Sequence, residues 1–144
     1  MTVALVDDDE AVLDSLRMAL ESRSIAVRCF TSAEAFMESL DELRPRCVVS
    51  DVRMPGWSGI ELQQALKARD ATLPLILITG HGDIPMAVNA IKEGAFDFIE
   101  KPFDYERLID SIMKAIEYGD RAHSAQAQLV DLAQRVGELS ERQR

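Results

Sequence analysis

The sequence predicts an α/β fold in which a five-stranded parallel sheet is covered by helices on both faces. Short apolar runs alternate with segments of helical periodicity five times along the chain. This alternation favours parallel pairing of the strands. The runs are also almost continuously apolar, as expected for strands buried on both faces. We therefore expect residues 1–118 to form one three-layer domain.

The first two strand–helix units are predicted within residues 2–43. TVALV at 2–6 predicts a buried strand, and apolar side chains near the helical period predict a helix over 10–22. IAVRCF at 25–30 predicts the second strand. Thr31 or Ser32 is suited to cap the next helix, because a hydroxyl there can accept hydrogen bonds from free backbone N–H groups.

The third and fourth units follow the same order. RCVVS at 46–50 predicts a strand, followed by a helix from Gly59 to Arg69. LPLILIT at 73–79 is the most apolar of the predicted strands. The next helix is predicted over 84–92 and is expected to end near Gly94, since glycine tolerates the left-handed backbone that often follows a helix.

The fifth strand is predicted at FDFIE, residues 96–100, and Asp104 can cap a final helix from Tyr105 onward. No proline interrupts residues 103–144. Apolar residues there recur in a heptad-like pattern, which is typical either of a signalling helix that pairs in a dimer or of a linker helix lying on its own domain. These residues are Ala115, Tyr118, Ala122, Ala125, Leu129, Leu132, Val136 and Leu139.

The charge and the cysteines limit the possible functions. The formal net charge is −9, and acidic and basic residues balance within 120–144, so the excess lies in 1–119. Such an acidic body repels nucleic-acid phosphates and favours cations. No apolar run approaches the length of a membrane span, so we expect a cytoplasmic protein. Cys29 and Cys47 lie in predicted strands and are expected to be buried thiols rather than a disulfide.

Polar residues follow four of the five predicted strands. In parallel α/β sheets the carboxyl ends of the strands meet at one edge, where ligands bind. The residues at this edge are Asp7, Asp8 and Asp9 after the first strand, Asp51 after the third, Thr79 after the fourth, and Glu100, Lys101 and Pro102 after the fifth.

These residue types together predict a site for phosphoryl transfer. Clustered carboxylates repel one another unless a cation lies between them, and oxygen ligands without histidine or cysteine favour Mg²⁺. A carboxylate can attack phosphorus, while an ammonium and a hydroxyl stabilise the phosphoryl oxygens. Each residue alone has an ordinary explanation: Asp8 or Asp9 could cap a helix, and Lys-Pro and Thr-Gly are common in turns.

Four segments in this order resemble the signature of response-regulator receiver domains, over residues 2 to about 118. The resemblance implies a doubly wound parallel sheet of the flavodoxin-like type, with strand order 2-1-3-4-5. It also implies a sensor histidine kinase as the phosphoryl donor. The segments are VDDDEAV, VVSDVRMPGWSGIEL, LILITGHG and FIEKPF.

The resemblance assigns a role to each residue at the strand ends. Asp51 would be the phosphoacceptor and Lys101 the contact to the phosphoryl group, and the resemblance implies a cis bond between Lys101 and Pro102. Thr79 would be the switch hydroxyl, with Phe98 as the switch aromatic where tyrosine is more usual. The metal ligands would be Asp7 and Asp8 as the acidic pair, Asp51, and the backbone carbonyl of Arg53.

Phosphorylation is expected to act through the surface of the helix over 84–92. Thr79 would move toward the phosphoryl oxygens, and Phe98 would turn into the space it leaves. Ala87, Val88 and Ile91 are expected to supply apolar contacts on that surface. This hypothesis predicts a phosphorylation-dependent homodimer, to which the linker helix contributes or from which it is released.

The last residues resemble the beginning of an output domain. We expect 119–139 to be a helical linker that ends near Gly137, and 140–144 to begin a domain truncated at Arg144. LSERQR resembles the start of the LuxR-type helix-turn-helix domain of FixJ-type transcription regulators. DNA would then be bound only through the missing output domain. Regulators with AAA+ outputs that activate sigma-54 share the receiver segments and are the alternative.

Two functions from other classes remain as alternatives. A haloacid-dehalogenase-like phosphatase also uses an aspartate nucleophile and Mg²⁺, but its nucleophile follows the first strand in a DxD pattern. Here Asp51 follows the third strand. A stand-alone receiver acting purely by protein contact is the second alternative. A receiver takes up phosphate about once and then loses it slowly, whereas a phosphatase turns over added substrate.

Overall fold

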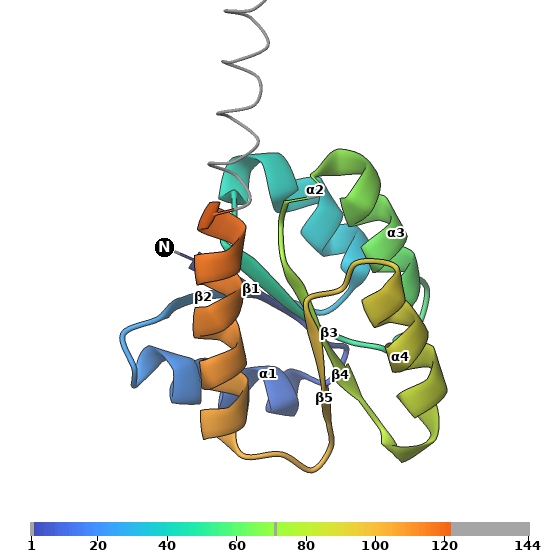
Figure 1. Cartoon of the computed structure of the whole chain (residues 1–144). Coiled ribbons are helices and arrows are strands. Elements are labelled where there is room, and N and C mark those ends of the chain that lie inside the picture. Colours follow the sequence, from blue (N-terminus) through green and yellow to red (C-terminus); the bar gives the residue numbers. More distant parts are fainter. Residues whose placement is uncertain (1, 71, 122–144) are drawn as a thin grey trace, which may run out of the picture.

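The computed structural model describes residues 2–70 and 72–121, and its centre is a parallel sheet of five strands in the order β2-β1-β3-β4-β5 (Figure 1). This is the predicted doubly wound fold, and the strand order is confirmed. The strands are β1 (Thr2–Val6), β2 (Ala26–Phe30), β3 (Cys47–Asp51), β4 (Leu75–Thr79) and β5 (Asp97–Glu100).

Helices follow each strand, and side chains cap three of them. Asp9 accepts from the backbone N–H groups of Ala11 and Val12, which decides between the two proposed caps of the first helix. Ser32 caps the second in the same way, and Ser58 the third. The helices are α1 (Glu10–Glu21), α2 (Ala33–Leu43), α3 (Gly59–Arg69), the short η1 (His81–Asp83), α4 (Ile84–Lys92) and a helix over 105–121.

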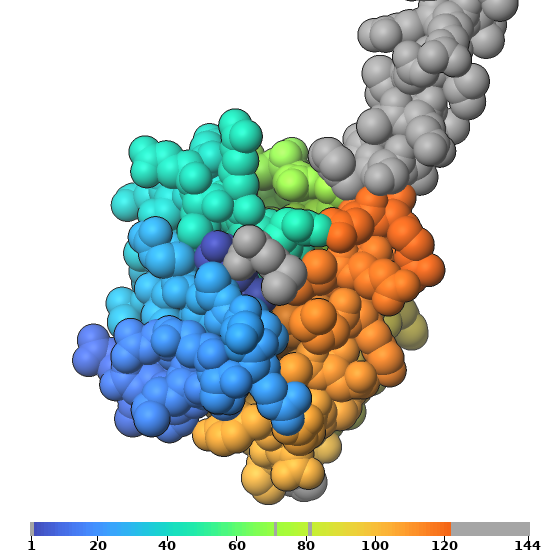
Figure 2. Space-filling view, turned by 90° about the vertical axis from the view of Figure 1, so that its left-hand side faces the viewer, coloured from blue at the N-terminus to red at the C-terminus, as the bar shows by residue number. Residues whose placement is uncertain are grey.

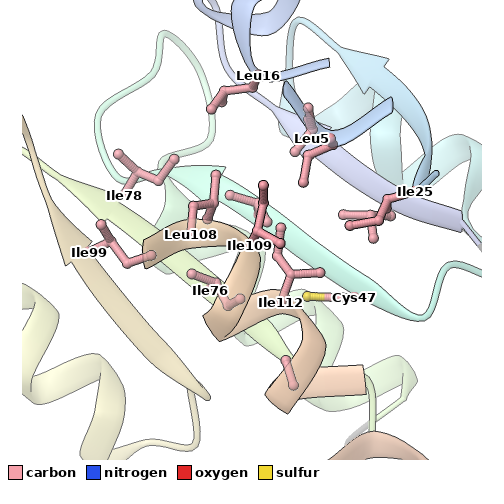
Figure 3. Close-up of a cluster of buried hydrophobic side chains, with 14 of the residues drawn as sticks. Leu5, Leu16, Ile25, Cys47, Ile76, Ile78, Ile99, Leu108, Ile109 and Ile112 are labelled. Carbon is pink, nitrogen blue, oxygen red and sulfur yellow. The ribbon is translucent and has the colours of Figure 1, made fainter. Parts of the chain in front are cut away.

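Two separate apolar cores lie on the two faces of the sheet. On one face, α1 and the 105–121 helix pack against the sheet; Figure 3 shows Leu16, Leu108 and Ile112 directed toward the strand side chains of Ile76 and Ile78. On the other face, α2, α3 and α4 cover the sheet. Strand side chains alternate between the two cores, which is why the strands are apolar almost throughout.

The 105–121 helix lies beside α1 on the surface shown in Figure 2. An ion pair between Arg23 and Glu106 joins the end of α1 to the beginning of this helix. Farther along, Tyr118 contacts the ring of Phe96, with centroids 5.4 Å apart. The end of the helix is therefore fixed to the segment that leads into β5.

Several sequence-based expectations change in detail. Four predicted strands begin one or two residues early: the apolar residues at 25, 73–74 and 96 lie in loops, and the strand predicted over 46–50 runs from Cys47 to Asp51. Both cysteines are free, as expected, but only Cys47 is buried; Cys29 is half-buried at the edge strand. Of the predicted heptad positions, Ala115 lies in the core of its own domain. The positions from 122 onward, and the predicted output start at 140–144, lie outside the described residues.

Candidate functional site

The register of the parallel strands brings the predicted polar residues together. Val6 pairs with Ser50, so Asp7 and Asp51, the next residue in each direction, lie side by side at the edge of the sheet. Thr79 pairs with Glu100, which places Lys101, the residue after β5, beside the end of β4. A backbone hydrogen bond of 2.8 Å from the Lys101 N–H to the Thr79 carbonyl fixes this position.

Asp7, Asp8 and Asp51 form one acidic group. Each offers a carboxylate oxygen, and these oxygens lie within 4.8 Å of one another. Asp7 is buried, with 3% of its surface exposed, and burial raises its pKa to about 6. The Asp9 N–H lowers that pKa through a 2.9 Å hydrogen bond to Oδ1, while the charge of Asp51 raises it. A cation would relieve both the burial penalty and the repulsion.

The Asp51 carboxylate is held from two sides. Its Oδ2 lies 3.2 Å from the Lys101 ammonium, and its Oδ1 accepts a 3.4 Å hydrogen bond from the Arg53 N–H. The Asp51 side chain is 13% exposed, so one side remains open to an incoming group. The Lys101–Pro102 bond is cis, as expected from the resemblance.

Two buried oxygens at this edge have no hydrogen-bond partner among the described residues. They are Oδ2 of Asp7 and Oγ1 of Thr79. Buried polar atoms are almost always hydrogen-bonded, so an orphaned oxygen indicates either strain or an absent ligand. Because both lie at the strand ends beside Asp51, they indicate a site suited to a further polar or charged group.

Gly59, the first residue of α3, lets that helix begin directly against the end of β3. A Cβ atom at this position would lie 2.6 Å from the Asp51 carbonyl oxygen and 3.0 Å from Cα of Val52. A backbone hydrogen bond from the Gly59 N–H to the Val52 carbonyl closes the loop between β3 and α3. Only glycine allows this approach, and it fixes the backbone on which Asp51 stands.

Comparison with known proteins identifies the family. Residues 3–113 match the response regulator receiver domain. The chain belongs to the response regulator receiver family. This match decides against the haloacid-dehalogenase-like phosphatase, and it makes the chain a signalling domain of a transcriptional regulator rather than a metabolic catalyst.

Individual relatives of this receiver domain are transcriptional regulatory proteins. The transcriptional regulatory protein FixJ of Bradyrhizobium diazoefficiens is 46% identical over 99% of the chain, which spans 69% of that protein. The crystal structure of full-length FixJ from B. japonicum has a TM-score of 0.81 at 45% identity, covering 95% of this chain and 68% of that one. The regulator DctD of Pseudomonas aeruginosa is 45% identical over 80% of the chain and 25% of its own length.

The structure of the receiver places Phe98 on the edge strand β5, half-buried against the core that α2, α3 and α4 cover. The predicted contact surface on α4 needs one correction. Val88 and Ile91 are 41% and 37% exposed, but Ala87 is fully buried. Ala87 and Ala90 face the sheet, and their small side chains let α4 lie close to it.

An ion pair between Arg53 and Asp83 was not anticipated from the sequence. The guanidinium of Arg53 lies 2.7 to 3.0 Å from both carboxylate oxygens of Asp83. Asp83 is only 5% exposed. It lies one residue before α4, where an aspartate usually caps the helix, yet its side chain makes no cap hydrogen bond. The hydrogen bonds that Arg53 donates to the Asp83 carboxylate raise the pKa of Arg53.

None of the helices within residues 2–70 and 72–121 has the length and apolar character needed to cross a bilayer.

Proposed function

We propose that this receiver accepts a phosphoryl group on Asp51 from the phosphohistidine of a sensor histidine kinase. The observation that carries the proposal is the position of the Asp51 carboxylate, 3.2 Å from the Lys101 ammonium and grouped with the carboxylates of Asp7 and Asp8. The side chain is largely shielded but has one open side. This arrangement suits a nucleophile whose product is a dianion.

In the transfer, one oxygen of Asp51 attacks phosphorus, and the bond between phosphorus and the imidazole nitrogen breaks. The nitrogen keeps the electron pair and takes up a proton, while Asp51 becomes an acyl phosphate. The Lys101 ammonium follows the new negative charge from the carboxylate to the phosphoryl oxygens. Because one side of Asp51 is open, water could also reach the acyl phosphate, so the domain would lose its phosphate slowly by itself.

The residues at the site fit a Mg²⁺ ion. Asp7, Asp8, Asp51 and the backbone carbonyl of Arg53 would hold it, with Asp8 and Asp51 as the direct carboxylate ligands. The orphaned Oδ2 and the raised pKa of Asp7 support a bound cation. When bound, the ion would neutralise charge on the phosphoryl oxygens.

The metal assignment can be tested by fluorescence, because Trp57 is half-buried in the loop that follows Asp51. Titration with Mg²⁺ should change Trp57 emission in the wild type. Asp8→Asn should remove this response and phosphorylation without unfolding the chain, because Asp8 is exposed and its loss reduces repulsion. Normal phosphorylation of Asp8→Asn would contradict the assignment.

Thr79 and Phe98 would convert phosphorylation into a change of surface. The Thr79 hydroxyl is buried and has no hydrogen-bond partner within the described ranges 2–70 and 72–121, so new phosphoryl oxygens would give it an acceptor. Its movement would open space that Phe98, half-buried on the neighbouring strand, can enter. We expect the exposed side chains of Val88 and Ile91 on α4 then to support a homodimer.

We further propose that residues 1–118 form the receiver, that 119–139 form a helical linker and that 140–144 begin a FixJ-type output domain in a cytoplasmic protein. FixJ aligns over 99% of the chain, including the residues of the proposed linker, which favours a FixJ-type output over the alternative with an AAA+ output. DNA binding would belong to the output domain, since the acidic receiver repels phosphate.

The decisive experiment is phosphorylation with acetyl phosphate and Mg²⁺, followed by mass spectrometry. The wild type should gain one phosphoryl group, which is labile in base as acyl phosphates are. Asp51→Asn should gain none. A phosphate found on Ser50 or Thr79 in the wild type would exclude the mechanism.

A further inference from the structure

The ion pair between Arg53 and Asp83 joins the two loops that flank Asp51. Arg53 follows Asp51 by two residues, and its backbone N–H contacts the Asp51 carboxylate. Asp83 lies four residues after Thr79, at the end of η1. The pair therefore connects the loop of the phosphoacceptor to the loop that carries the switch hydroxyl. Each end is close to a group that phosphorylation would move or charge.

The geometry makes this pair a restraint on the second loop. The guanidinium binds through Nε at 2.8 and 3.0 Å and through a terminal nitrogen at 2.7 Å, which fixes both oxygens of Asp83. The Asp83 N–H donates to the Gly80 carbonyl at 3.1 Å, so the carboxylate moves with the backbone next to Thr79. Arg53 supplies the only cation recorded beside this carboxylate among the described residues.

The pair also restrains the beginning of α4, because Asp83 is the residue directly before that helix. A hollow of about 620 Å³ lies beside Arg53 and is lined by side chains of the loop after β3, of α3 and of α4. Its lining residues include Met54, Pro55, Ile60 and Met86.

We propose that the Arg53–Asp83 pair is a latch that holds the loop of residues 80–83 in its unphosphorylated position. This rests on the proposed function, in which Asp51 is the phosphoacceptor. A phosphoryl group on Asp51 would compete for the guanidinium, whose planar fork of N–H donors can bind two phosphate oxygens at once. Movement of Thr79 toward that group would draw the same loop away from Arg53. Both effects open the latch.

The latch predicts that the loop is freer when the pair is removed, even without phosphate or metal. Arg53→Gln is the best variant, because the Arg53 side chain is 73% exposed and its removal leaves the core intact. Its backbone N–H and carbonyl are also retained. Amide hydrogen exchange of residues 80–83, measured by NMR on the unphosphorylated chain, should accelerate by about tenfold, on the order of a typical coupling between sites.

The second measurement is the affinity for beryllofluoride, a phosphoryl mimic, in the presence of Mg²⁺. If the latch opposes the phosphorylated state, Arg53→Gln and Asp83→Asn should each bind it about fivefold more tightly than the wild type. Arg53→Lys, which keeps the charge but loses two-point binding, should lie between them and the wild type. The double variant should gain no more than either single variant, because both remove the same interaction.

The matched control is the pair between Arg69 and Asp41, which has the same 2.7 Å separation but joins α3 to α2. Arg69→Gln should leave both measurements unchanged. The latch is overturned if Arg53→Gln exchanges at the wild-type rate or binds beryllofluoride no more tightly. Failure of the wild type itself to bind beryllofluoride would instead contradict the phosphoacceptor role of Asp51, and the exchange measurement would still test the latch.

Discussion

The Lys101 ammonium lies 3.2 Å from Oδ2 of Asp51, so the unphosphorylated carboxylate already has a cation beside it. The two residues belong to β3 and to the turn after β5, which are separated in the sheet by β4. They meet because parallel strands end at the same edge. The cation is in position before any phosphoryl group arrives, and only its ammonium group has to shift toward the phosphoryl oxygens during the transfer.

Replacing Lys101 with methionine should slow phosphorylation by acetyl phosphate by roughly a hundredfold, the usual effect of removing one charge-stabilising donor. Stability should change little, because the Lys101 side chain is 39% exposed. The measurement is the rate of mass gain in intact-protein mass spectrometry. Lys67→Met, which removes an exposed lysine paired with Glu93, is the control and should react at the wild-type rate. Equal rates for both variants would contradict the role of Lys101.

Asp7→Asn should stabilise the metal-free domain. Burial raises the Asp7 pKa from 3.8 to about 6, so the folded state is penalised when this group ionises. The penalty is absent below the unfolded pKa, grows as pH rises from 3.8 to about 6, and is complete above that. Urea unfolding at pH 7.5 should show a gain of roughly 1–3 kcal/mol for the variant. The difference should vanish by pH 3.5; a constant difference across pH would contradict the assignment.

Gly59→Ala should destabilise the domain by about 1–3 kcal/mol, as forced overpacking usually does. The added Cβ would lie 2.6 Å from the Asp51 carbonyl oxygen, which is backbone and cannot turn aside. Exposed glycine-to-alanine changes in helices normally stabilise by about 0.5–1 kcal/mol. A loss of stability in Gly59→Ala would therefore distinguish overpacking from the ordinary effect of helix propensity. Gly82→Ala, with no atom within 4 Å of the new Cβ, is the control. Thermal unfolding followed by circular dichroism measures both.

Ile91→Arg should accept phosphate normally but remain monomeric. Ile91 is 37% exposed on α4, far from the strand ends, and a charge there would oppose burial in a dimer. Analytical ultracentrifugation with and without phosphodonor should show dimerisation weakened by about tenfold or more. Met18→Arg changes a more exposed apolar residue on α1 and should dimerise like the wild type. If Ile91→Arg also dimerises normally, the linker helix becomes the better candidate interface.

The residues at the strand ends could be predicted well, because polar side chains that end an apolar run can be recognised from the sequence alone. Asp7, Asp51 and Thr79 each end an apolar run, and parallel topology then brings them to one edge. The order of the strands required the family resemblance, because alternation of strands and helices alone allows several orders.

Other features depend on side-chain directions that periodicity does not determine. In α4 nearly every residue is apolar, so the pattern could not show that Ala87 and Ala90 face the sheet while Met86 and Val88 face outward. Asp83 stands where a capping residue is expected, and only the folded structure shows its carboxylate bound to Arg53, 30 residues away in sequence.

The reacting groups are separate from the outer surfaces of the helices, so the partners of such a domain can be changed independently of its chemistry. Among the described residues, the groups of the proposed site belong to strand ends and adjoining loops, while the helices bury one side in the two cores and leave the other free. The outer faces of α1 and α4 can therefore be exchanged with those of relatives without touching the reacting groups. Such grafts would change which partners the domain serves and leave its phosphoryl chemistry intact.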